Sequence, residues 1–183
     1  MEKWIGEPHP LKRWGYRLFG ELHVPGRIRS NHILKAVRRL RLMEKPIRML
    51  DAGSGKGELA IHLARCCPHW QAVGIDLSAE RTEKARQISK QLGLENVNFL
   101  TRPLEELDCQ EEFDLIISAD VLEHIEDDRK VLRNLFRALR PGGIIIVTSP
   151  SIPQRKHLWL VHWREKRIGF HPSEYGHVRD GYS

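Results

Sequence analysis

Three closely spaced glycines mark the stretch most suited to ligand chemistry, LDAGSGKGELA at residues 50–60. They are Gly53, Gly55 and Gly57. Glycine adopts positive φ angles readily and lets a ligand approach the backbone without an intervening Cβ. The spacing G-x-G-x-G differs from the G-x-G-x-x-G of dinucleotide sites, and Lys56 is not followed by the Ser or Thr of a P-loop. We therefore expect close backbone contact with a ligand and no phosphate cradle; a plain tight turn is the alternative.

An acidic side chain follows this loop at a sequence spacing that suits contact with the same ligand. Asp76 lies in the segment GIDLS (residues 74–78), nineteen residues after Gly57. A carboxylate can accept hydrogen bonds from both vicinal hydroxyls of a ribose, the role of an acid in nucleoside-binding α/β folds. The sequence therefore predicts a nucleoside ligand without a phosphate requirement, although Asp76 as a helix cap is the alternative.

Apolar runs and breaker residues predict which elements hold these groups. Ser30 is expected to cap a helix whose apolar face includes Ile33, Leu34, Val37 and Leu40. The expected elements are helices over 30–43, 58–66, 79–92 and 128–139, and strands over 47–50, 72–78, 97–101, 113–118 and 144–149.

Strands that alternate with helices predict the fold class. We expect an α/β protein with a Rossmann-like open, mostly parallel sheet, helices on both faces and an N-terminal helical extension. The expected domains are a basic helical extension over 1–45, a ligand-binding domain over 46–150 and an acceptor-side or lid segment over 151–183. Ligands in such sheets bind at the carboxyl ends of the strands.

Four motifs in order carry a family resemblance: LDAGSGKGELA, GIDLS, FDLIISADVLEHIED and RALRPGGIIIVTSP. Over about residues 47–150 the chain resembles the class I S-adenosylmethionine-dependent methyltransferases, in the branch that acts on small molecules. The resemblance implies transfer of a methyl group to a small-molecule or lipid- or sugar-linked acceptor, at an undetermined O, N or C atom. S-adenosylmethionine is the implied cofactor and S-adenosylhomocysteine (SAH) its product.

The resemblance also assigns roles by position. It places the methionine end of the cofactor against the glycine loop and the end of the fourth strand, the ribose against Asp76, and the adenine beside Leu77 and the segment after the third strand. The implied cofactor residues are Asp51, Gly53, Ser54, Gly55, Gly57, Asp76, Leu77, Leu104, Glu105, Ser118, Ala119 and Asp120. Asp120 as a local cap is an equal alternative.

One position departs from the family pattern. Many relatives carry an aspartate after the third strand that meets the adenine amino group, and Pro103 stands there in this chain. Either Glu105 or a backbone group is expected to substitute.

The motifs assign no catalytic base, because the cofactor carries the reactivity and the protein supplies binding and orientation. Leu122, Glu123 and His124 follow the cofactor segment. His124, His177 and Arg179 are the candidates for catalysis, with a structural hydrogen bond as the alternative for His124. An anionic acceptor is expected to meet Arg155, Lys156 or Arg179. No metal site is expected.

Charge is distributed unevenly along the chain. Residues 1–49 carry 12 Lys+Arg against 4 Asp+Glu, residues 50–150 carry 12 against 17, and residues 151–183 carry 6 against 3. Such asymmetry marks an anionic substrate, a membrane surface or nucleic acid, or else a solvated helix face. An RNA methyltransferase is therefore an alternative function, although no RNA-binding module is visible. A non-catalytic cofactor-binding module is another alternative, supported by Pro103 and by the absence of recognisable strands after Ser149 in the sequence.

Composition and length complete the expectations. Three cysteines, no CxxC pair, no apolar N-terminal core and no long apolar stretch predict a cytoplasmic protein without a transmembrane segment. Relatives continue after the fifth strand with a helix and an antiparallel strand pair, which nothing after Ser149 resembles. A truncated chain is therefore expected, or one whose uncovered edge at Ile144 to Val147 forms a homodimer.

Overall fold

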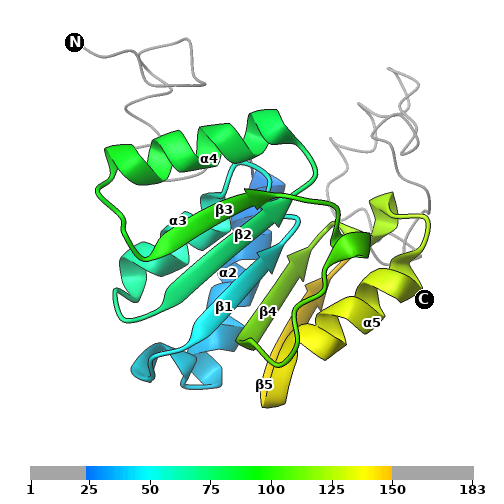
Figure 1. The fold of residues 1–183 in the computed structure, drawn as a ribbon. Coiled ribbons are helices and arrows are strands. Elements are labelled where there is room, and N and C mark those ends of the chain that lie inside the picture. Colours follow the sequence, from blue (N-terminus) through cyan, green and yellow to red (C-terminus); the bar gives the residue numbers. More distant parts are fainter. Residues whose placement is uncertain (1–23, 150–183) are drawn as a thin grey trace, which may run out of the picture.

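The fold is known from a computed structural model that describes the backbone of residues 24–149 and the side chains from Ser30 onward. Figure 1 shows a single twisted sheet with helices on both faces. The elements are α2 (Val24–Arg39), η1 (Leu42–Glu44), β1 (Arg48–Ala52), α3 (Glu58–Cys66), β2 (Gln71–Asp76), α4 (Ala79–Gln91), β3 (Val97–Thr101), η2 (Leu104–Glu106), β4 (Phe113–Ala119), η3 (Leu122–His124), α5 (Asp128–Ala138) and β5 (Leu139–Thr148).

The five strands are arranged in the order β3-β2-β1-β4-β5, and every pairing is parallel. The order reverses direction at β1, which pairs with β2 on one side and β4 on the other. This confirms the predicted α/β fold with an open parallel sheet. The reversal between β1 and β4 creates the kind of crevice in which open α/β sheets bind ligands.

Two apolar clusters lie on opposite faces of the sheet. One contains side chains of α2, α3 and α4, among them Ile33, Val37 and Ala85. The other contains side chains of α5 and η2, among them Leu104 and Leu135. Figure 1 shows α5 in front of the sheet and α2 and α3 behind it. β4 is almost uniformly apolar, as expected of a strand that is covered on both faces.

Short local signals explain where α4 and α5 begin. The side chain of Ser78 accepts a hydrogen bond from Arg81 N at the start of α4. The side chain of Asp127 accepts from Lys130 N at the start of α5. These are N-caps, which satisfy backbone N–H groups that lack an intrahelical partner.

Two expected boundaries are wrong. Ser30 does not cap the first helix, because α2 already begins at Val24 and ends at Arg39. Leu40 was expected on the buried face but is exposed, whereas Ile33 and Val37 are buried. The chain leaves the helix after Arg39, and Arg41 in the following turn takes a positive φ of 55°.

The last strand also begins earlier than predicted. Leu139 pairs with Phe113, and the next pair joins Ile144 to Leu115, so residues 140–143 form a bulge inside β5. Pro-Gly-Gly therefore does not separate the helix from the strand. No helix within residues 24–149 is long and apolar enough to span a membrane.

Candidate functional site at the carboxyl ends of the strands

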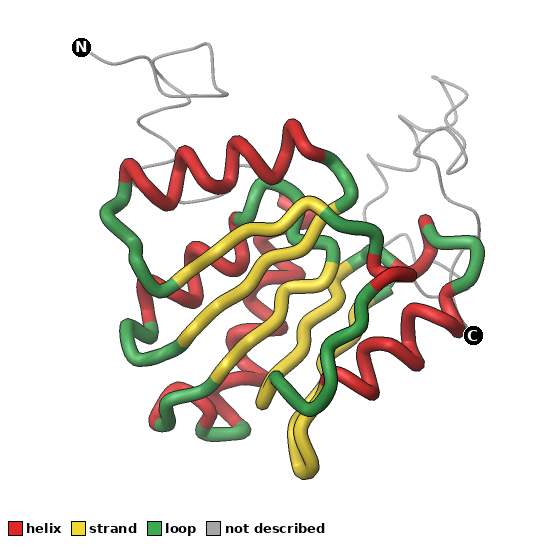
Figure 2. Tube along the Cα trace, in the orientation of Figure 1, coloured by secondary structure: helices red, strands yellow, loops and turns green. Residues whose placement is uncertain are grey.

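Backbone hydrogen bonds tie the glycine loop to the neighbouring strand. The N–H groups of Gly53 and Ser54 both donate to Ile75 O, at 2.8 and 2.9 Å. Gly57 N then donates to Ser54 O at 2.8 Å and closes the turn that opens α3. Figure 2 shows this loop, in green, between β1 and α3. These main-chain hydrogen bonds therefore anchor the loop to the end of β2.

Asp76 is an acidic group at this edge that two backbone N–H groups hold in place. It is only 8% exposed, its Oδ2 accepts from Gly55 N at 2.8 Å and its Oδ1 from Ser78 N at 2.9 Å. A carboxylate offers about four acceptor positions, so roughly two remain for a ligand. Leu77, beside it, is 74% exposed. The carboxylate is thus fixed in orientation and still able to accept from a pair of hydroxyls.

Two glycines of the loop have contrasting surroundings. Gly55 has a φ of +55°, and a Cβ built on it would meet nothing within 4 Å. Gly57 has a φ of +77°, and its Cβ would lie 2.5 Å from the Phe99 ring. Gly55 therefore borders open space where a ligand can contact the backbone, whereas Gly57 is required for packing. A Cβ on Gly53 would clash with Val121.

The register of the strands brings the other predicted residues to the same edge. Asp51 is buried in β1 opposite Gly74 and Ile117, and Ala52 is paired with Ser118. Ser118 is fully buried, and its hydroxyl has no hydrogen-bond partner among the described residues. The Ser54 hydroxyl also lacks one.

Asp120 adopts a conformation that is uncommon for a residue with a side chain. Its φ is +54°, its N–H donates to Thr148 O at 2.9 Å, and its Oδ1 accepts from Thr148 Oγ1 at 3.1 Å. The two bonds join the ends of β4 and β5. Such strain persists only where surrounding contacts enforce it, and it is frequent at functional sites.

Glu123 was not among the predicted cofactor residues, yet it is buried at this edge. It is 1% exposed; its Oε2 accepts from Ser149 Oγ at 3.5 Å, and its Oε1 has no partner. A buried carboxylate is costly unless it is hydrogen-bonded. His124, next to it, is exposed. The sequence analysis named Glu123 only as a residue that follows the cofactor segment in the motif FDLIISADVLEHIED, and its spacing does not indicate burial.

The segment after β3 is held by a residue that the sequence analysis did not single out. Asn134 of α5 donates from Nδ2 to Leu104 O at 3.1 Å and to Glu105 O at 2.9 Å. The Leu104 side chain is buried in the core, and Glu105 is partly exposed. Leu104 therefore faces the apolar cluster, and Glu105 is the more accessible of the two.

These residues fit the nucleoside end of S-adenosylmethionine. Asp76 offers acceptor positions for ribose hydroxyls, and the open space at Gly55 admits a ligand to the backbone. The unpartnered Ser54 and Ser118 hydroxyls supply polar groups that a ligand can satisfy. The expected acceptor-side residues His177, Arg179, Arg155 and Lys156 lie outside the described residues.

A cavity of about 380 Å³ lies at the opposite edge of the sheet, among the amino ends of the strands. Its lining includes Arg48, Gln71, Asn96, Asp114 and Arg140. None of the predicted cofactor residues lines it. We place the candidate functional site at the carboxyl edge, because the buried hydroxyls of Ser54 and Ser118 and the open space at Gly55 lie there.

Comparison with known proteins identifies the family of this chain. A family model described as "Methyltransferase domain" matches residues 43–168. The ubiquinone biosynthesis O-methyltransferase of Rickettsia prowazekii is 27% identical over 154 residues, which cover 84% of this chain and 60% of that protein. The norajmaline N-methyltransferase of Rauvolfia serpentina is 35% identical over 108 residues, 58% of this chain and 37% of that protein.

A solved structure shares the fold. Coclaurine N-methyltransferase, bound to N-methylheliamine and SAH, superposes with a TM-score of 0.58 at 19% identity, covering 64% of this chain and 35% of that one. At this identity the likeness concerns the fold alone. The chain spans about three fifths of the length of the first of these curated relatives.

Proposed function

Because the chain belongs to the methyltransferase domain family, we propose that it binds S-adenosylmethionine at the carboxyl edge of its sheet and methylates a small-molecule acceptor. The observation that carries this proposal is the Asp76 carboxylate, buried and oriented by the N–H groups of Gly55 and Ser78. It is the group on this edge best arranged to hold two adjacent ribose hydroxyls.

In this proposal the other residues of the site bind and orient the cofactor. The bound cofactor would supply a methyl group that is already activated as a sulfonium. Gly55 leaves room for the ligand, while Ser54 and Ser118 offer hydroxyls to its polar groups. Asn134 fixes the backbone of Glu105 near the expected adenine position, where Pro103 contributes neither an N–H nor a carboxylate. Alignment of acceptor and methyl carbon can contribute up to roughly 7–11 kcal/mol in model reactions.

We propose that the acceptor is a small molecule and, more specifically, that it carries an anionic group. His124 is the described candidate for a base, because it is exposed beside the buried Glu123. A base is needed only for an acceptor hydroxyl of low acidity or a protonated amine.

The three unpaired cysteines support a cytoplasmic location. A homodimer through the β5 edge also remains part of this proposal.

Calorimetric titration of SAH into the wild-type chain and into Asp76→Ala tests the proposal. We expect micromolar affinity for the wild type and a loss of at least tenfold in the variant, since about two hydrogen bonds to a charged acceptor disappear. Asp108→Ala is the matched control, because its carboxylate pairs on the surface with Arg102 at 3.0 Å.

Equal affinity of Asp76→Ala and the wild type would overturn the ribose assignment. Binding of the cofactor without turnover on panels of phenols, amines and carboxylic acids would favour the non-catalytic cofactor-binding module. Methyl transfer from labelled cofactor to RNA instead would favour the RNA methyltransferase.

A further inference from the structure

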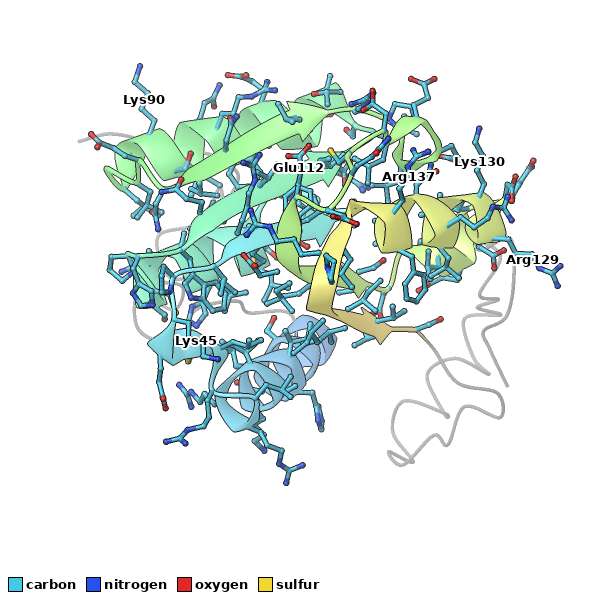
Figure 3. The ribbon with its side chains drawn as sticks, turned by 60° about the horizontal axis from the view of Figure 1, so that its bottom comes forward. Lys45, Lys90, Glu112, Arg129, Lys130 and Arg137 are labelled. Carbon is cyan, nitrogen blue, oxygen red and sulfur yellow. The ribbon has the colours of Figure 1, made fainter. Side chains whose placement is uncertain are left out.

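The solvent face of α5 is entirely cationic apart from one phenyl ring. Every exposed residue of this helix belongs to that face: Arg129, Lys130, Arg133, Phe136 and Arg137. At 100° per residue these five positions span an arc of about 120°, opposite the buried Val131 and Leu135. In Figure 3 the side chains of Arg129 and Lys130 project from α5 away from the sheet. We call these five residues the α5 basic face.

The cations of the α5 basic face are not neutralised by neighbours. Within the described part of the chain, no ion pair involves Arg129, Lys130 or Arg133, and Arg137 donates to a backbone oxygen, Leu107 O, at 2.9 Å. The exposed face of α4 is different. There Lys84 pairs with Glu80 at 3.0 Å and Arg86 with Glu83 at 3.4 Å. A merely solvated helix is expected to resemble α4, with both signs interspersed.

Nearby carboxylates form no ion pair with Arg129, Lys130 or Arg133 within the described residues. Glu126 and Asp127 precede the helix, the Asp127 carboxylate caps Lys130 N, and Asp128 is buried. The surrounding residues 50–150 carry 12 Lys+Arg against 17 Asp+Glu. The α5 basic face is therefore a local positive surface on a domain that is acidic as a whole.

Phe136 gives this surface an apolar component. It is 59% exposed and lies one residue before Arg137 and three after Arg133. A cluster of four Lys and Arg side chains on an amphipathic helix is typical of surfaces that bind anionic lipid headgroups, and an exposed Phe beside them adds apolar area for contact with the bilayer. We propose that the α5 basic face docks the protein on an anionic lipid surface.

The geometry favours a lipid surface over nucleic acid. The face is the exposed side of a single helix, with one aromatic ring, whereas single-stranded nucleic acid is bound in grooves with successive stacking side chains. The acidic remainder of the domain would also repel a long polyanion that extended beyond the helix. A bilayer needs contact with one face only.

Vesicle co-sedimentation of the full chain tests this proposal. The vesicles are phosphatidylcholine with about 30% phosphatidylglycerol, compared with phosphatidylcholine alone. We expect binding only to the anionic vesicles and a loss of at least tenfold at about 0.5 M salt, where charges are screened within a few ångströms. The triple variant Arg129→Gln, Lys130→Gln, Arg133→Gln is expected to lose at least tenfold in partitioning.

A variant with the same change in net charge provides the control. Lys35, Arg38 and Arg39 are exposed on α2, on the other side of the sheet, and their replacement by Gln also removes three cations. This variant is expected to keep more than half of the wild-type partitioning. SAH affinity and the thermal midpoint of each variant show whether the fold is intact.

Three results would overturn the proposal. One is equal loss in the α2 and α5 variants, which would mean that net charge alone drives binding. Another is no binding of the wild type to anionic vesicles. The third is tighter binding to a single-stranded RNA oligonucleotide than to vesicles, with loss in the α5 variant, which would assign the face to nucleic acid.

Discussion

Gly55 and Gly57 show how one residue type serves two purposes within three positions. Both have positive φ, at 55° and 77°. A Cβ on Gly57 would lie 2.5 Å from the Phe99 ring and 2.9 Å from Ala85 Cβ, whereas a Cβ on Gly55 would meet nothing within 4 Å. Gly57 is therefore required by the core, and Gly55 borders the expected ligand.

Alanine substitutions are expected to separate these purposes. Gly57→Ala should lower the free energy of unfolding by about 2–4 kcal/mol, since left-handed backbone strain adds to overpacking. Gly55→Ala should cost only about 1–2 kcal/mol of strain but weaken SAH binding at least tenfold, because its methyl group occupies the ligand's space. Urea denaturation and calorimetric titration measure the two effects. Unchanged SAH affinity in Gly55→Ala would place the ligand elsewhere.

Among individual residues, the sequence predicts those that are marked by a short motif or a fixed spacing. Asp76 and the glycine loop were identified from spacing, and their hydrogen bonds are consistent with the predicted role. Asn134 and Glu123 were not identified as binding residues. Asn134 acts on a segment 29 and 30 residues away, and Glu123 is buried against Ser149, 26 residues away. Such contacts depend on tertiary packing, which spacing does not encode.

At the scale of elements, Asp114 joins three strands at the amino edge of the sheet. Its Oδ2 accepts from Arg48 N of β1 at 2.7 Å, and both its oxygens accept from Arg140 Nη1 of β5 at 2.9 Å. Partial burial by itself would raise the pKa of Asp114. The hydrogen bonds from Arg48 and Arg140 outweigh it, and the pKa is lowered from the ordinary value of 3.8.

This shift predicts a pH dependence of stability. A carboxyl with a lowered folded-state pKa stabilises the fold above its unfolded pKa, and that contribution is lost as the pH falls through the folded value. Asp114→Asn should therefore be less stable than the wild type at pH 7. The difference should shrink as the pH falls from about 4 toward 2. Urea denaturation at several pH values measures it, and a difference independent of pH would contradict the assignment.

Element types were predictable, and some boundaries were not. The strands were recognised because buried parallel strands are continuous apolar runs. The start of β5 was misplaced because Pro141, Gly142 and Gly143 are typical turn residues, whereas pairing of Leu139 with Phe113 makes them a bulge. The start of α2 was misplaced because Ser30 is a typical cap residue that here lies inside a helix.

At the scale of the whole molecule, β5 forms one edge of the sheet within the described residues. It pairs with β4, no strand within residues 24–149 pairs with its other side, and Val147 is exposed. Unpaired edge strands are prone to association. We expect the chain to become dimeric as its concentration rises, and Val147→Lys to shift it toward the monomer. Light scattering across a concentration series measures this, and a constant monomeric mass for the wild type would contradict it.

The strand order also affects how the chain can fold while it is being synthesised. Parallel pairs require long-range closure, which is slow and exposes unpaired strands meanwhile. β1 is made first, yet Met49 pairs with Ala72 on one side and with Leu115 on the other. While the chain grows on the ribosome, the strand at the centre of the finished sheet therefore keeps one open side until residue 119 has emerged. The nascent protein is most in need of chaperone protection during that interval.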